Sequence, residues 1–221
     1  PSLFLIRQRQ RCISDSDITF GNFIVTPGVR FEDIELERRD WSTLPRNATP
    51  SLKQNSVTAV LPSIGVLYNV NDKLSLLAGA YNGFGTPTTT SGVEEEQALN
   101  VELGGRYQQA DLMIELIAFT SDYENLVGEC TASSSTSDCD IGDQFNGGEA
   151  TVRGLEFQLT NNYQLTDNTA MPVSLAYTYT NAAFDSTFDG EFFGDVNKGD
   201  PIPYIPKAQV ALALGLENGP Y

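Results

Sequence analysis

The sequence predicts an all-β fold, an antiparallel up-and-down transmembrane β-barrel, on the strength of three observations. Segments in which apolar and polar residues alternate recur along the 221 residues, and this is the pattern of strands with one apolar and one polar face. About nine such strands are present, each of about 10 to 14 residues, long enough to cross a bilayer at a tilt. The connections between them alternate strictly between short and long, as in outer-membrane barrels.

The predicted strands follow one another in chain order. Residues 2–11 form the most weakly patterned strand, and clean alternation begins at Phe23, continuing through Val25, Val29 and Phe31 toward residue 38. Pro27 has no N–H to donate, so it indicates a sheet edge or a bulge. The remaining strands are expected over residues 58–70, 74–84, 99–127 (a hairpin that turns at 108–111), 150–163, 172–182 and 208–217.

The lengths of the connections favour a barrel over a soluble sandwich. Short corners are predicted at residues 20–22, 71–73, 108–111 and 165–169, and long loops at 39–57, 85–97, 124–149 and 183–207. Because successive strands run in opposite directions, all short corners fall at one end of the sheet and all long loops at the other. Backbone groups in lipid must be fully paired, so residues 1–221 are expected to be part of one larger barrel domain.

In such a barrel the apolar strand faces meet lipid and the polar faces line a wet interior. Five charged residues are therefore expected to face the lumen: Arg30, Glu102, Arg106, Glu115 and Glu156. Five aromatic residues lie near the predicted strand ends, where they form membrane-interface girdles or serve as ordinary strand aromatics. They are Tyr68, Tyr107 and Tyr163 near the short corners, and Phe84 and Tyr123 near the long loops.

Composition excludes several functions. The net charge of −16 and the pI near 4.2 argue against binding nucleic acid, because phosphate contacts need clustered Lys and Arg. The chain has no His, so a Ser-His-Asp triad is impossible, and it has no P-loop or G-x-S-x-G motif. The acidic loops do not match the spacing of an EF-hand. We therefore expect no enzyme, no cofactor and no metal site, and the carboxylates Glu102 and Glu115 fit a polar interior better than a glycosidase site.

Nearly a third of the 13 basic residues gather in the first long loop and its flanks. In an otherwise acidic chain such a cluster can attract an anionic ligand, and Arg suits bidentate recognition of carboxylates. The neighbouring acids Glu37 and Asp40 favour the alternative, a solvated loop. The candidate ligand-binding residues are Arg38, Arg39, Trp41, Arg46 and Lys53.

Two of the three cysteines, Cys130 and Cys139, bracket a segment rich in Ser, Thr and Asp that is expected to be an exposed loop. A disulfide between them would place the chain in an oxidising compartment. The alternative is a pair of free loop thiols, while a metal site is disfavoured because no His and no third ligand stand at a suitable spacing. Cys12 is left without an assigned partner.

Five stretches, in order, resemble the barrel of TonB-dependent outer-membrane receptors. They are VTPGVRFE (25–32), LPSIGVLYNVNDKLSLLAGAYNGFGTP (61–87), ALNVELGGRYQ with IAFTSDYENLV (98–108 and 117–127), GGEATVRGLEFQLTNNY (147–163) and GDPIPYIPKAQVALALGL (199–216). Each match alone has low specificity, but five in order across residues 25–216 make the family a strong hypothesis. The GFGTP and IPYIPK details resemble the siderophore and ferric dicitrate-like branch.

The resemblance implies a barrel of about 22 strands around an N-terminal plug, in the outer membrane among bilayer lipid and lipopolysaccharide. It implies uptake of a scarce ligand, most simply a ferric siderophore or ferric citrate-like chelate, energised by the TonB complex through the plug. The plug and the closing strands are expected outside the residues given. Ligand contacts do not transfer from the family, since they lie in the plug and variable loops. The alternatives are a passive porin or adhesin-type barrel, and a soluble secreted β-sandwich.

Overall fold

The computed structural model describes residues 2–41, 49–86, 93–129, 144–146, 148–190 and 194–219. The all-β prediction is confirmed, because every regular element in these ranges is a strand. Within the same ranges no helix is long and apolar enough to cross a membrane.

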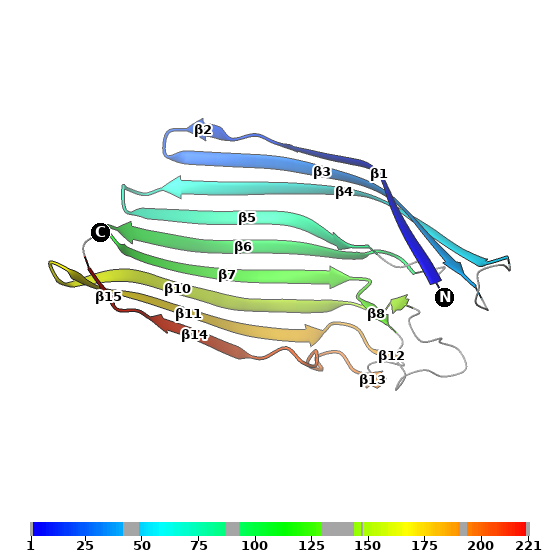
Figure 1. Ribbon diagram of the computed structural model, residues 1–221. Coiled ribbons are helices and arrows are strands. Elements are labelled where there is room, and N and C mark those ends of the chain that lie inside the picture. Colours follow the sequence, from blue (N-terminus) through cyan, green and yellow to red (C-terminus); the bar gives the residue numbers. More distant parts are fainter. Residues whose placement is uncertain are drawn as a thin grey trace.

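Nine long strands follow one another across one antiparallel sheet (Figure 1). Two short strands extend it, with β2 (Ile18–Phe20) beside β3 and β15 (Glu217–Asn218) beside β11. The nine are β1 (Ser2–Asp15), β3 (Phe23–Asp40), β4 (Ser51–Asn69), β5 (Leu74–Gly85), β6 (Glu96–Gln109), β7 (Leu112–Glu124), β10 (Ala150–Thr166), β11 (Thr169–Phe184) and β14 (Ala208–Leu214).

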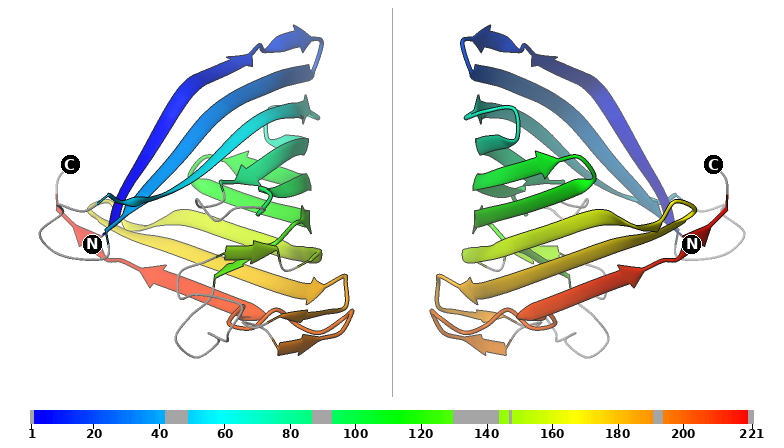
Figure 2. Two further views of the ribbon diagram at one scale, coloured as in Figure 1. Left: turned by 90° about the vertical axis from the view of Figure 1, so that its right-hand side faces the viewer. Right: turned by 90° about the vertical axis from the view of Figure 1, so that its left-hand side faces the viewer.

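The sheet bends into an open arc and does not close on itself (Figure 2). Its two edges are β1 and β14, and the other long strands each pair with the strands before and after them along this order. Two small hairpins lie outside the sheet, one of β8 (Val127–Glu129) with β9 (Gln144–Asn146) and one of β12 (Phe188–Gly190) with β13 (Gly194–Val196). The architecture is that of a wall segment from an up-and-down barrel.

The predicted alternation of connections is confirmed. Short turns at 21–22, 70–73, 110–111 and 167–168 lie at one end of the strands, on the left in Figure 1. The strand ends that are joined by the long connections 41–50, 86–95, 125–149 and 185–207 lie at the other end. The prediction of a first loop over 39–57 was wrong, because β4 already begins at Ser51 and pairs in register with β3 up to Asp40.

Strand register separates the side chains into two faces. One row of mutually paired residues crosses the sheet on what we name the outer face: Phe23, Tyr68, Leu76, Gly105, Leu116, Phe157, Tyr177 and Val210. A second row crosses on what we name the inner face: Thr26, Gly65, Gly79, Glu102, Phe119, Gly154 and Thr180. Large apolar residues dominate the first row, and polar or small residues dominate the second.

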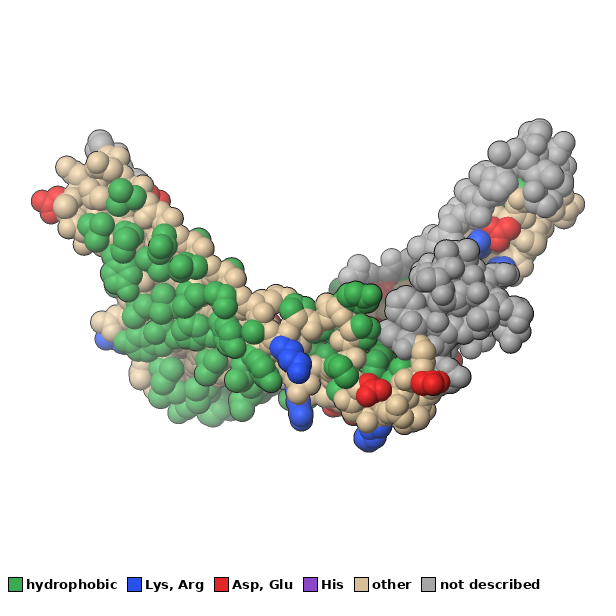
Figure 3. Space-filling model, turned by 90° about the horizontal axis from the view of Figure 1, so that it is seen from below, with side chains coloured by type: hydrophobic (Ala, Val, Ile, Leu, Met, Phe, Trp, Pro, Cys, Tyr) green, Lys and Arg blue, Asp and Glu red, His purple; other side chains and the backbone are tan. Residues whose placement is uncertain are grey.

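Large apolar side chains on the outer face are exposed, which is the reverse of a soluble domain. Leu103 is 64% exposed and Leu212 62% exposed. Seen from below, apolar side chains gather in one broad area, with most charged side chains at or beyond its edges (Figure 3). A sheet with this outer face is stable where lipid covers it.

Most of the buried apolar residues of the described chain lie on the long-connection side of the sheet, while Ala170 is buried at the short-turn end. Five residues of β3 and β4 are buried on the inner face, namely Ile34, Leu36, Val57, Ala59 and Leu61. A second cluster joins Ala150, Phe184 and Val196, with Phe188 packed edge-on against Phe184 at a centroid distance of 5.4 Å. These two clusters stabilise the parts of the chain that extend past the apolar area.

Pro27 lies in the interior of β3, opposite the break between β1 and β2. Ser16 N donates to Pro27 O over 3.3 Å, but proline has no N–H with which to return the bond. The neighbouring strand is accordingly interrupted at residues 16–17, while its register continues unchanged into β2. The predicted effect of Pro27 therefore falls on the adjacent strand and leaves β3 continuous.

Candidate functional site

The inner face carries a polar wall over β5, β6, β7 and β10. Tyr81 Oη on β5 donates a hydrogen bond to Glu102 Oε1 on β6 over 3.3 Å, and Ser121 Oγ donates to Asn100 Oδ1 over 2.7 Å. These bonds link side chains on adjacent strands of one face, so they hold the wall in a fixed arrangement. We name this surface the inner wall.

A hollow of about 190 Å³ lies in the inner wall. Its lining includes Tyr81, Asn100, Glu102, Phe119 and Glu156. Within the described part of the chain neither Glu102 nor Glu156 forms an ion pair. The hollow is therefore an acidic surface that suits a cationic group.

All five residues predicted to face the lumen lie on the inner face by register. Arg106 and Glu115 are direct cross-strand partners, and Arg106 Nε lies 2.5 Å from Glu115 Oε2. Glu102 and Glu156 lie on either side of β7, at the hollow. Arg30 stands apart from these four residues on β3.

Arg30 forms its own cluster near the long connections. Arg30 Nε donates to Glu32 Oε1 over 2.5 Å, and the Glu32 side chain is fully buried. The Arg30 guanidinium also lies 5.9 Å from the centroid of the Phe84 ring on β5, a cation–π distance. Because a buried carboxylate is costly unless it is paired, this cluster fixes the geometry of β3 at this level.

The basic residues predicted to bind a ligand are divided between the two faces. Arg38 lies opposite Lys53 on the inner face, whereas Arg39 lies opposite Leu52 on the outer face. Each arginine has an acidic partner two residues away, Asp40 Oδ1 at 3.0 Å from Arg38 Nε and Glu37 Oε1 at 2.5 Å from Arg39 Nε. Strand alternation thus places Arg38 and Arg39 on opposite faces of the sheet. The neighbouring carboxylates offset part of the positive charge of each arginine.

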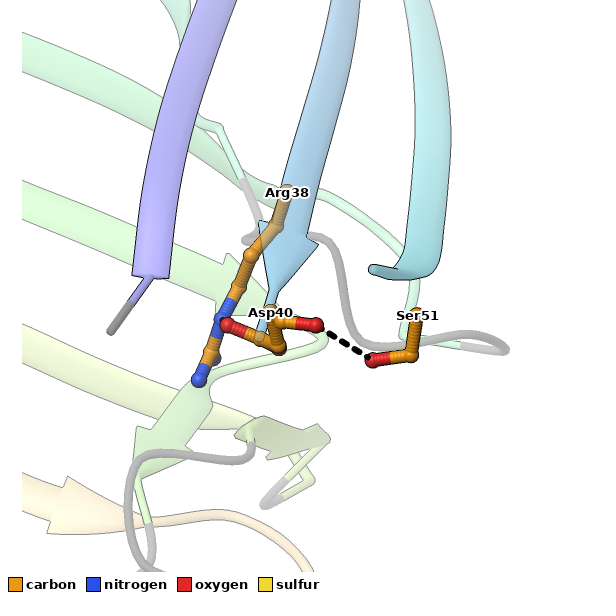
Figure 4. Close-up of polar contacts among 3 residues, drawn as sticks. All are labelled: Arg38, Asp40 and Ser51. Atoms are coloured by element: carbon orange, nitrogen blue, oxygen red, sulfur yellow. Dashed lines mark hydrogen bonds and ion pairs between the residues drawn. The ribbon is translucent and has the colours of Figure 1, made fainter. Parts of the chain in front are cut away.

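Figure 4 shows how the hairpin end of β3 and β4 holds Arg38. The Arg38 side chain runs beside Asp40, and the Ser51 hydroxyl points toward the backbone of Asp40. Ser51 Oγ donates to Asp40 O over 3.5 Å, joining the last residue of β3 to the first of β4. The inner-face pair of Arg38 and Lys53 therefore sits on a hydrogen-bonded ribbon, and Lys53 lies in a strand where the sequence predicted a loop.

Other predicted residues fall at or beyond the limits of what is described. Trp41 is half-buried directly after β3. Arg46, Cys130 and Cys139 lie outside the described residues, so the predicted disulfide and one member of the basic group stay predictions. The backbone of Cys12 lies in β1 opposite Phe31.

Three of the five predicted girdle aromatics lie on the outer face close to the short turns. They are Tyr68, Tyr107 and Tyr163, and Tyr163 is 47% exposed. Tyr68 packs against Phe23 at a ring-centroid distance of 4.4 Å, and Phe23 stacks on Phe20 at 5.4 Å. The sequence analysis missed these two Phe partners, although both border the predicted short corner at 20–22.

Of the two aromatics predicted for the long-loop end, Tyr123 does not match that assignment, whereas Phe84 lies on the outer face by register. Tyr123 lies on the inner face, paired with Ala98 and Ala150, and packs against the Ala150 cluster. The physical reason is strand parity, because Tyr123 is an odd number of residues from the outer-face Leu116. Phe84 is half-buried, and its ring lies against the Arg30 guanidinium.

Tyr81 and Glu32 are site residues that sequence reasoning missed. The pairing of β5 with β6 could have indicated Tyr81, since it places Tyr81 on the same face as Glu102. No pattern in the sequence indicated the burial of Glu32, because it occupies an ordinary polar position in an alternating strand.

A family model described as TonB dependent receptor-like, beta-barrel, matches residues 14–221. The structure of the ferric citrate transporter FecA in the unliganded form superposes with a TM-score of 0.67 and 26% sequence identity, covering 91% of this chain and 29% of that one.

Two further solved structures share the fold at lower identity. The alcaligin outer membrane receptor FauA from Bordetella pertussis gives a TM-score of 0.68 at 15% identity, covering 96% of this chain and 34% of that chain. The ferric yersiniabactin uptake receptor FyuA from Yersinia pestis gives 0.64 at 15% identity, covering 96% and 31%. The chain therefore spans about a third of the length of the structures it matches.

Proposed function

The chain belongs to the TonB-dependent receptors, as part of their outer-membrane β-barrel, and from this membership we propose that the protein containing it takes up a ferric chelate. The chelate is a ferric citrate-like complex or a ferric siderophore. The convex apolar area and the sorted connections are the features that such a barrel needs in the outer membrane.

One observation supports an anionic ligand most directly. Arg38 and Lys53 face each other across β3 and β4 on the inner face, beyond the buried cluster toward the long connections. Two cations on one face give this end of the ribbon a local positive charge in a chain of net charge −16, and such a site attracts anions. A carboxylate-rich chelate can accept hydrogen bonds from both side chains.

The comparison with FecA supports the same ligand class. FecA, a ferric citrate transporter, shares 26% identity over 91% of this chain, and citrate is a tricarboxylate. Arg binds carboxylates through two parallel hydrogen bonds, so the proposed role of Arg38 needs no metal ligand from the protein. The iron is cargo that the chelate carries.

The negative charge of the inner wall favours a positively charged partner inside the barrel. Glu102 and Glu156 border a hollow without ion pairs in the described part of the chain. We propose that the plug lies against this acidic wall and that the TonB complex acts on the plug to release the ligand. Charges on the barrel wall that face the plug would orient the plug in the barrel and would also strengthen its binding to the wall.

Titration of the purified full-length receptor with ferric citrate tests the ligand assignment. We expect Arg38→Gln to weaken binding about tenfold or more, as is typical when one charge-assisted hydrogen bond is lost. Arg39→Gln is the matched control, because it removes the same charge from the adjacent residue on the opposite face. Equal affinity of both variants and the unchanged receptor would contradict the assignment.

A further inference from the structure

A groove of about 590 Å³ crosses the outer face over β6, β7, β10 and β11. Its floor is formed by the small residue Ala118, and its walls by Leu103, Leu155 and Tyr179. These four residues form one register row, so the groove is built where a small side chain stands between larger ones. Its surface is almost entirely apolar.

Arg153 stands at the end of this groove toward the long connections. It lies in the next register row, between Thr120 on β7 and Asn181 on β11. Arg153 is exposed, and no ion pair to it exists within the described part of the chain. The outer face thus holds an unpaired cation directly above an apolar groove.

The level of Arg153 in the membrane follows from its neighbours. The row on its loop side contains Asp122 and Thr151, whereas the rows on its other side contain Leu155 and Phe157. Arginine is costly at the bilayer midplane and tolerated near the interface. Arg153 therefore lies at headgroup level, and since long loops of such barrels are extracellular, the headgroups belong to the outer leaflet.

We propose that the groove binds an acyl chain of a phosphate-bearing glycolipid of the outer leaflet, and that Arg153 pairs with the phosphate of that lipid. An acyl chain matches the apolar groove, and a phosphate matches the guanidinium fork, which can donate two parallel hydrogen bonds. The groove lies within the bilayer, where lipid surrounds it. A water-soluble ligand therefore does not reach it.

The acids above Arg153 leave room for this pairing. The Asp122 carboxylate accepts hydrogen bonds from Thr120 Oγ1 at 3.4 Å and from Thr151 Oγ1 at 3.1 Å. The same hydroxyl lies within hydrogen-bonding reach of Asp185, and its single proton serves one of the two carboxylates at a time. No ion pair joins Asp122 or Asp185 to Arg153 in the described part of the chain, so the guanidinium stays open to the lipid phosphate.

The test uses the full-length receptor in phosphatidylcholine nanodiscs with added bisphosphorylated lipid A, whose retention is counted by native mass spectrometry. We expect Arg153→Gln to lower lipid A retention about tenfold, as for one lost charge-assisted hydrogen bond, and Arg153→Lys to restore part of it. Ala118→Trp, which fills the groove from an exposed position, should also abolish retention. Lys73→Gln at the short-turn end is the matched control and should leave retention unchanged.

Three outcomes would overturn the proposal. If Arg153→Gln and Ala118→Trp both retain as much lipid A as the unchanged receptor, the lipid contacts the barrel surface without a specific site. Retention lost in Arg153→Gln but kept in Ala118→Trp would show an arginine that reaches the headgroups without using the groove. Equal displacement of lipid A by phosphatidylglycerol would show no preference for the glycolipid. Ferric citrate binding is measured on the same variants and should not change, so failure here is distinct from failure of the proposed function.

Discussion

Arg106 and Glu115 face each other across the β6–β7 hairpin, with Arg106 Nε and Nη2 each 2.5 Å from Glu115 Oε2. The pair lies on the inner face near the short turn, where Arg106 is about half exposed and Glu115 largely buried. Both charges were predicted to face the lumen, and the hairpin register brings them into direct contact.

This pair should stabilise the barrel only modestly. We expect a coupling free energy of about 0.5 to 1 kcal/mol, because water reaches the arginine and screens the interaction. A double-mutant cycle of Arg106→Gln and Glu115→Gln, measured by urea unfolding of the full-length receptor in lipid vesicles, gives this value. A coupling near zero would show that the short contact has no energetic role.

The outer-face assignment predicts a strong asymmetry between neighbouring positions. Leu116→Arg places a charge in the middle of the apolar area and should cost about 2 to 4 kcal/mol. Gln158→Arg on the inner face beside Glu115 should be tolerated. Folding yield into vesicles distinguishes the two variants, and equal yields would contradict the orientation of the wall.

Glu32 should control the rigidity of the β3–β4 ribbon. Glu32→Gln removes the buried charge that pairs with Arg30, and because water reaches the arginine, losing this charge-assisted hydrogen bond should destabilise the ribbon by about 1 to 2 kcal/mol. Hydrogen exchange of the amides in β3 and β4 should therefore accelerate. Asp33→Asn, the neighbouring residue on the outer face, is the control and should leave exchange rates close to those of the unchanged protein.

Gly154 is required by a close approach of two neighbours. A Cβ at Gly154 would clash with Tyr179 O and would lie 2.8 Å from Phe119 Cζ, with the Phe119 ring covering the glycine. Gly154→Ala should destabilise the barrel by about 1 to 3 kcal/mol through overpacking. Gly65→Ala is the comparison, since its nearest contact would be an ordinary 3.8 Å. Similar unfolding midpoints for the two variants would contradict this packing.

Much of the wall was predictable because the bilayer imposes a period of two on every strand that crosses it. Leu116 and Glu115 could be assigned to opposite faces from alternation alone, and the sorted connections indicated which face meets lipid. The same parity, counted from Leu116, would have placed Tyr123 on the inner face.

The upper part of β3 and β4 could not be predicted by this reasoning. Residues 51–57 extend past the apolar area and carry polar side chains on both faces, so no alternation marks them as a strand. The split of Arg38 from Arg39 follows only once that strand is known.

The groove at Ala118 needed the three-dimensional arrangement for a different reason. Its walls and floor come from four strands, so neither the small residue nor Arg153 is informative in its own segment. The contact of Arg30 with Phe84 also joins strands that are not neighbours in the sheet.

The most direct test of the account is uptake of radiolabelled ferric citrate by cells that carry the full-length receptor. We predict uptake that requires TonB and that falls about tenfold in Arg38→Gln at low ligand concentration, in line with the loss of one charge-assisted hydrogen bond. Arg39→Gln should transport at the normal rate. Uptake that persists without TonB, or that is the same in Arg38→Gln as in the unchanged receptor, would contradict the proposed function.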